Sequence, residues 1–170
     1  MIVISMGLWG NFKNKTIKKS EGISLIFEKG IEQDLRKEYI YLVKWLRKNY
    51  IFPVHINIYI LNKEKVELLN GNLAYGSFRW FPKRNPIIKI PSLINYNEYD
   101  GYTKGEIYDN VLSSLIHELT HYYQWVIQVK QTNSISERQA DYYRYKILDN
   151  YYREKKRNLR ENLYLQLIKN

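Results

Sequence analysis

The sequence predicts one α+β domain, with strands in its first half and two long helices in its second half. Apolar and polar residues alternate over residues 54–60, as they do in a strand with one buried face. Over residues 31–50 and 106–129, apolar residues recur at intervals of three and four, which is typical of amphipathic helices. A chain of 170 residues without an internal repeat is long enough for one domain to bury its own core.

A basic leader is expected over residues 1–22, followed by the domain over residues 23–170. The leader starts with an apolar run, residues 1–9, which reads as a short strand or an apolar arm. No basic region precedes this run and no small-residue cleavage site clearly follows it, so we do not interpret it as a signal peptide. No stretch approaches the roughly 20 apolar residues that span a bilayer. These patterns predict a cytoplasmic protein without a membrane span.

The first half of the domain reads as a strand, a helix and a second strand. Apolar and other residues alternate over residues 23–28, which read as the first strand, ending at Gly30. The helix over residues 31–50 has acidic residues in its first turn and basic residues in its last, which matches the helix dipole. The strand over residues 54–60 follows Pro53. Polar residues 62–70 are expected to hold no more than a helical turn.

A hairpin and two helices complete the predicted domain. Residues 73–81 read as an aromatic strand and residues 86–91 as its partner, with the intervening Pro-rich segment as the turn. After the helix over residues 106–129, a break leads to a long helix that starts at Ser136. That helix is expected to be interrupted near Asp149 or Asn158.

Composition restricts the chemistry that the chain can carry. It has no cysteine, which excludes disulfides, thiolate metal ligands and cysteine nucleophiles. The net charge is +10, and basic residues cluster at 13–19 and at 153–160. Such clusters can meet nucleic acid, an anionic membrane or an acidic partner. The chain is also rich in Lys, Ile, Asn and Tyr, the bias of an AT-rich genome, so we keep nucleic acid open as a partner without favouring it.

The segment His117-Glu118-Leu-Thr-His121 has the pattern H-E-x-x-H within the predicted helix over residues 106–129. One helical turn separates the histidines, so both project from one face and can bind one metal ion. Glu118 lies where its carboxylate can act as a general base beside that metal. With three histidines in the chain, this pattern arises by accident in roughly one shuffled sequence in four hundred. The alternative is a pair of surface histidines on an amphipathic helix.

A catalytic zinc ion usually has a third protein ligand, and Glu137 is the main candidate. Asp141 lies one turn later on the same face, where it could orient a ligand histidine through the free ring N–H. Glu137 could instead close a capping box with Ser134, although Ser136 and Gln139 spell a second box that leaves Glu137 free. His55 is the rival third ligand.

The residues His117-Glu118-x-x-His121 and Glu137-x-x-Ala-Asp141 resemble the gluzincin metallopeptidases, including the ImmA/IrrE-like peptidases. This resemblance covers roughly residues 23–150. It implies a zincin-like domain in which a small mixed sheet with a hairpin packs on the motif helix and on a helix that carries the glutamate. It also implies Glu118 as catalytic base and an edge strand, near residues 72–76, that binds substrate as an added strand.

Two features depart from the family pattern. The interval before Glu137 is short, and no later histidine is present to stabilise the transition state. Tyr145 or Arg144, two turns beyond Glu137, could take that role.

The sequence therefore predicts zinc-dependent hydrolysis of peptide bonds in a peptide or protein substrate. The zinc ligands would be His117, His121 and Glu137, with Glu118 as the base. The alternative is a zincin-like scaffold that binds nucleic acid or a regulatory protein with little or no turnover.

Overall fold

The computed structural model describes residues 8–10 and 22–167, with side chains to residue 161, and forms an α+β fold as predicted. The element order is β1, α1, β2, β3, β4, β5, β6, a short 3-10 helix, α2 and α3. The basic cluster at residues 13–19 and most of the expected strand over residues 1–9 lie outside the described residues.

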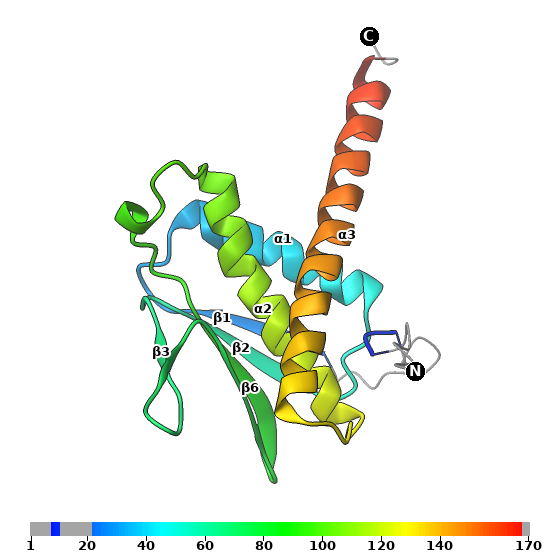
Figure 1. Cartoon of the computed structure of the whole chain (residues 1–170). Coiled ribbons are helices and arrows are strands. Elements are labelled where there is room, and N and C mark those ends of the chain that lie inside the picture. Colours follow the sequence, from blue (N-terminus) through cyan, green and yellow to red (C-terminus); the bar gives the residue numbers. More distant parts are fainter. Residues whose placement is uncertain (1–7, 11–21, 168–170) are drawn as a thin grey trace.

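A four-stranded mixed sheet forms one layer of the domain (Figure 1). Its strand order is β1-β2-β6-β5, where β1, β2 and β6 are parallel and β5 is antiparallel to β6. The inward residues of the two central strands are fully buried isoleucines, which explains the alternation in the sequence. The strands are β1 (Ile23–Phe27), β2 (Ile56–Leu61), β5 (Ser77–Phe81) and β6 (Arg84–Pro91).

The predicted strand over residues 73–81 is in fact two strands in different sheets. Leu73–Ala74 forms β4, which pairs with β3 (Val66–Glu67) in a separate two-stranded hairpin. The polar stretch 62–70 therefore contains a strand and not the helical turn that we expected. The chain leaves β4 and enters β5 at Gly76, where its backbone passes beside an α2 side chain described below.

The β5–β6 hairpin is confirmed, but its turn is shorter than predicted. β5 ends at Phe81 and β6 begins at Arg84, so Pro86 lies inside a strand. The register shifts between Arg79 and Phe81 opposite this proline. A bulge tolerates proline because a ladder hydrogen bond is already missing there.

The helices cover one face of the sheet, with α1 against β1, α2 against β5 and β6, and α3 against α2 (Figure 1). α1 spans Gln33–Asn49, α2 spans Lys104–Val126 and α3 spans Asn133–Leu167. α2 starts earlier than predicted because Thr103 and Glu106 form a capping box. It also ends earlier, at Val126, and Gln128 just beyond its end is left-handed (φ 53°).

α3 is one continuous helix of 35 residues, without the interruption expected near Asp149 or Asn158. At 1.5 Å per residue it is roughly 50 Å long. Its first half packs on α2, and its second half extends away from the sheet (Figure 1). Along residues 156–161 of that second half every side chain is exposed.

Part of the expected leader belongs to the core. Leu8 and Trp9 are buried, and Trp9 donates a hydrogen bond through Nε1 to Oγ1 of Thr120 on α2 (3.2 Å). Its ring also contacts Tyr50 and Tyr123, with centroid distances of 5.1 and 4.7 Å. The sequence boundary at residue 22 therefore does not mark where core packing begins.

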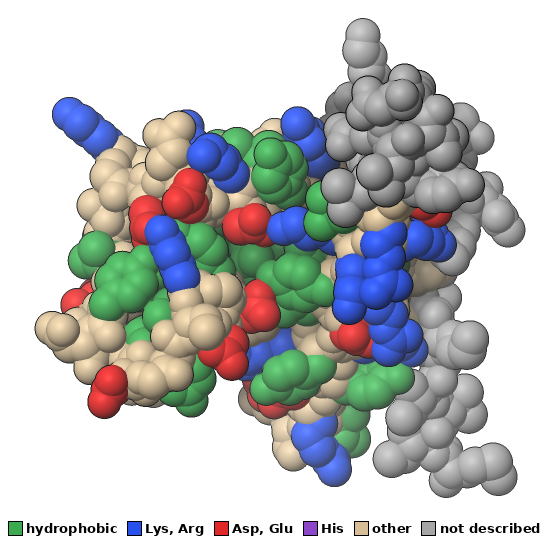
Figure 2. Space-filling view, turned by 90° about the horizontal axis from the view of Figure 1, so that it is seen from above, with side chains coloured by type: hydrophobic (Ala, Val, Ile, Leu, Met, Phe, Trp, Pro, Cys, Tyr) green, Lys and Arg blue, Asp and Glu red, His purple; other side chains and the backbone are tan. Residues whose placement is uncertain are grey.

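Basic side chains of α3 gather on the face that is seen from above, but acidic side chains lie among them (Figure 2). Arg153 pairs with Asp149, and Lys155 pairs with Glu38 of α1 at 2.8 Å. The cluster at residues 153–160 is therefore partly neutralised. Within the part of the chain that the structure describes, no helix is long and apolar enough to cross a membrane.

Candidate metal centre

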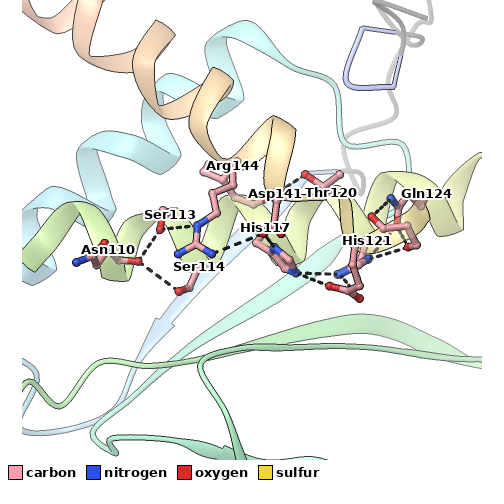
Figure 3. A network of polar contacts seen from close by, with 12 residues as sticks. Asn110, Ser113, Ser114, His117, Thr120, His121, Gln124, Asp141 and Arg144 are labelled. Carbon is pink, nitrogen blue, oxygen red and sulfur yellow. Dashed lines mark hydrogen bonds and ion pairs between the residues drawn. The ribbon is translucent and has the colours of Figure 1, made fainter. Parts of the chain in front are cut away.

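Helix α2 presents His117 and His121 side by side on the face that meets α3 (Figure 3). Their Nε2 atoms lie 3.1 Å apart, and their rings are 4.9 Å apart at a steep angle. The opposite side of α2 supplies the core, because its apolar stripe is buried. That stripe consists of Tyr108, Leu112, Leu115, Leu119 and Tyr122. The amphipathic pattern of this helix is thus confirmed.

Helix α3 brings Glu137 to the two histidines. Its Oε2 lies 3.2 Å from Nε2 of His117, and its Oε1 lies 3.4 Å from Nε2 of His121. One ligand atom from each of these three residues falls within 4.8 Å of the others, so the group could hold a metal ion. The connection between α2 and α3 is only a few residues long, which brings the start of α3 back beside the histidines.

A separate partner holds the other ring nitrogen of each histidine. Nδ1 of His117 lies 3.2 Å from Oδ1 of Asp141, as the sequence predicts. Nδ1 of His121 lies 2.8 Å from Oε1 of Gln124, a contact that the sequence analysis missed. Carboxylate and amide oxygens can only accept hydrogen bonds, so these two contacts favour the histidine tautomer with its proton on Nδ1, in which the Nε2 lone pair is open to a metal ion.

Gln124 is itself fixed by α3, which explains why an amide can take this position. Its Nε2 donates to the backbone oxygen of Ser136 at 3.0 Å and to Oε1 of Gln139 at 2.9 Å. The hydroxyl of Ser136 donates to Gln124 Oε1 at 2.7 Å. Gln124 is 7% exposed, so these bonds also satisfy a buried amide.

These donor atoms fit a metal ion. Two lone pairs and a carboxylate face one another at 3.1 to 3.4 Å, an arrangement that a cation would stabilise. Two ligands that each lie about 2.0–2.1 Å from a tetrahedral zinc ion are roughly 3.3 Å apart. Burial, and then the neighbouring His121, lower the pKa of His117, which favours the neutral imidazole that metal binding requires.

Glu137 is not a helix cap, and neither predicted capping box is present. α3 begins at Asn133, and the backbone N–H groups of Ile135 and Ser136 both donate to the Thr132 carbonyl oxygen. Ser136 instead lies inside the helix and bonds Gln124. His55, the rival ligand, lies apart from the metal group, and its Nε2 is 3.0 Å from Oγ of Ser24 on β1.

Glu118 lies beside the metal group, but it is only 9% exposed. Burial raises its pKa to about 8, and the charge of Glu137 adds to the effect, while a hydrogen bond from the Phe78 backbone opposes it. A Cβ atom at Gly76 would lie 2.6 Å from Oε1 of Glu118. Only glycine therefore allows the backbone between β4 and β5 to approach this carboxylate. Nothing in the sequence pattern pointed to Gly76.

Arg144 and Tyr145 take different positions. Arg144 lies seven residues after Glu137, nearly two full helical turns, and its side chain reaches back over α2 (Figure 3). Its Nε donates to Oγ of Ser113 at 3.0 Å, and its Nη1 lies 3.7 Å from Asp141. Tyr145 points about 100° further round the helix and is 67% exposed, outside the cleft described next.

A cleft of about 830 Å³ opens between α2, the start of α3 and strand β5. His117, Glu118, His121, Glu137 and Arg144 line it on the helical side. On the other side runs β5, which among the described residues pairs with β6 alone and so forms an edge of the main sheet. The edge strand is therefore residues 77–81 and not residues 72–76 as predicted, because the latter segment belongs to the β3–β4 hairpin.

Comparisons with protein-family models, with curated proteins and with solved structures gave no match. The functional interpretation therefore rests on the geometry of these side chains.

Proposed function

We propose that this protein is a zinc-dependent endopeptidase of the gluzincin type. The observation that carries the proposal is the convergence of His117, His121 and Glu137 beside a buried Glu118 in an open cleft. Nδ1 of each histidine is already held by a partner, as in established metal sites. Two imidazoles and one carboxylate are a common ligand set of hydrolytic zinc sites.

A zinc ion bound there would supply Lewis-acid polarisation of the scissile carbonyl and a water molecule with a pKa near 7. Glu118 would then take the proton of the attacking water and pass it to the amine nitrogen as the peptide bond breaks. A bound zinc ion would oppose the effects of burial and of Glu137 on the pKa of Glu118, which favours the ionised form that a base needs.

Arg144 is the best-placed group to stabilise the negative charge that develops on the carbonyl oxygen. It lines the cleft and is oriented by Ser113 and Asp141, and its guanidinium presents several hydrogen-bond donors. Arg144 thus replaces Tyr145 in this role, since Tyr145 points away from the cleft.

The free edge of β5 is the proposed binding surface for an extended substrate. Backbone N–H and C=O groups on this side of an edge strand have no partner strand, so a peptide can add to the sheet there. A peptide bound in this way would have its backbone between β5 and α2, beside Glu118. The carboxylate of Glu118 accepts a hydrogen bond from the backbone of Phe78 on β5.

The test is a comparison of wild type with Glu118→Gln on an unfolded protein mixture, with cleavage read by mass spectrometry. The amide is nearly isosteric but cannot accept a proton, so we expect turnover to fall roughly 10²–10⁴-fold while zinc content stays the same. Cleavage by the variant at the wild-type rate would contradict the proposal. If the zinc-loaded wild type cleaves nothing, the endopeptidase proposal fails.

A further inference from the structure

One end of the cleft carries an aromatic surface that catalysis does not use. Trp80 of β5 and Trp125 of α2 lie with centroids 6.3 Å apart and ring planes only 20° apart. Phe78 supports Trp125 from the side, with a centroid distance of 6.0 Å. Trp80 is 55% exposed, so much of its indole remains open beyond the stack. We refer to Trp80 and Trp125 as the tryptophan shelf.

The shelf lies next to the metal group on two independent elements. Trp125 follows His121 by one helical turn, about 6 Å along α2. The backbone of Phe78 is hydrogen-bonded to Glu118. Trp80 lies two residues after Phe78, which is roughly 7 Å along β5. An extended peptide on the edge of β5 advances about 3.3 Å per residue, so a side chain within two or so positions of the cleaved bond reaches the shelf.

We propose that the tryptophan shelf is a specificity site for a large apolar side chain, preferably aromatic, close to the cleaved bond. This proposal rests on the proposed endopeptidase function. Aromatic rings attract one another in offset or edge-to-face geometry, and a bound ring would cover indole surface that is now in water.

A nucleobase could also stack on tryptophan, and the cleft lining carries Arg79 and Arg144 as well as Glu118 and Glu137, so charge does not separate the two classes of ligand. The edge of β5 does separate them, because a peptide backbone can hydrogen-bond along an edge strand and a sugar-phosphate backbone has no N–H groups to do so. The shelf is therefore assigned to a peptide side chain.

The experiment measures binding separately from cleavage. Zinc-loaded Glu118→Gln protein is titrated by calorimetry with capped Ala/Ser hexapeptides that carry one Phe at each position in turn, and with the Phe-free peptide. We expect one or two Phe positions to tighten binding about tenfold. In the Glu118→Gln background, Trp80→Ala should abolish that gain and Trp80→Phe should keep part of it. Tyr102→Ala is the matched control, because Tyr102 is 57% exposed and does not line the cleft.

Each outcome decides between the two proposals. Equal binding of Phe and Phe-free peptides, or a Phe gain that survives Trp80→Ala, overturns the shelf. Tighter binding of a single-stranded oligonucleotide than of any peptide, lost in Trp80→Ala, also overturns it. Wild-type cleavage without aromatic preference leaves the endopeptidase standing and removes the shelf. A Phe gain without any cleavage by wild type keeps the shelf as a binding site and removes the endopeptidase.

Discussion

At the scale of single residues, the site depends on groups that hold the ligands as much as on the ligands. Asp141 orients the ring of His117, and Gln124 orients the ring of His121. In each case a side-chain oxygen lies within hydrogen-bond distance of the histidine Nδ1. The sequence predicted Asp141, because its spacing from Glu137 matches a family pattern. It could not predict Gln124, because a glutamine on a polar helix face has no distinctive signature and its partners come from α3.

Asp141→Asn tests the positioning of His117. Asparagine can still accept a hydrogen bond, but it lacks the charge that strengthens the bond from Nδ1. Zinc affinity, measured by competition with a chromophoric chelator, should fall roughly 10–100-fold. Asp149→Asn is the control, because Asp149 lies on the same helix with a similarly exposed side chain (55% against 56%) and, among the described residues, forms an ion pair with Arg153 alone. Equal affinities for the two variants would remove Asp141 from the metal site.

The raised pKa of Glu118 predicts how the stability of the metal-free protein depends on pH. Its folded pKa of about 8 exceeds the ordinary 4.5, so the folded state binds more protons than the unfolded state between these values. The contribution of Glu118 to the free energy of unfolding should therefore fall as pH rises from 4.5 to 8, by an amount on the order of a few kcal/mol. Glu118→Gln should remove most of this fall. Urea unfolding in a chelating buffer at pH 5.5 and 8.5 measures the free energy of unfolding at each pH. The same change in this free energy between the two pH values in wild type and in Glu118→Gln would contradict the burial argument.

At the scale of elements, local patterns predicted the helices well and the strands less well. The helical periodicity located α1, α2 and α3 to within a few residues, because each helix buries one regular stripe. The single strand expected over residues 73–81 was wrong, since the break at Gly76 is set by a contact with Glu118 on α2. A contact between residues so far apart in the sequence leaves no trace in a local pattern.

Gly76→Ala tests that contact. The added Cβ would lie 2.6 Å from Oε1 and 2.8 Å from Cγ of Glu118, so either the carboxylate or the β4–β5 link must move. A displacement of about 1 Å at a catalytic group can cost 10²-fold in rate. Peptide cleavage should fall by about that factor while zinc stays bound. Gly105→Ala is the control, because its Cβ would meet only Thr103 Oγ1 at 4.0 Å. Full activity of Gly76→Ala would show that the approach is not tight.

At the scale of the whole molecule, the fold class was predicted and the sheet order was not. In the sheet order β1-β2-β6-β5, the strand that comes last in the sequence, β6, lies between β2 and β5. Such pairing depends on contacts between residues far apart in the sequence. The burial of Trp9 against α2 was equally hidden, since a single tryptophan in a basic leader has no periodicity. The metal group belongs to this scale as well, because it exists only when α3 folds back on α2.

The metal content of untagged protein tests the central claim most directly. Elemental analysis should find about one zinc per chain in wild type and in His55→Ala and Ser134→Ala, since neither His55 nor Ser134 belongs to the metal group. Glu137→Gln should lose the zinc while its helical circular dichroism is unchanged, because a neutral amide is a poor ligand for a dication and Glu137 caps no helix. A wild-type protein without metal, or a Glu137→Gln variant that keeps its zinc, would contradict the account.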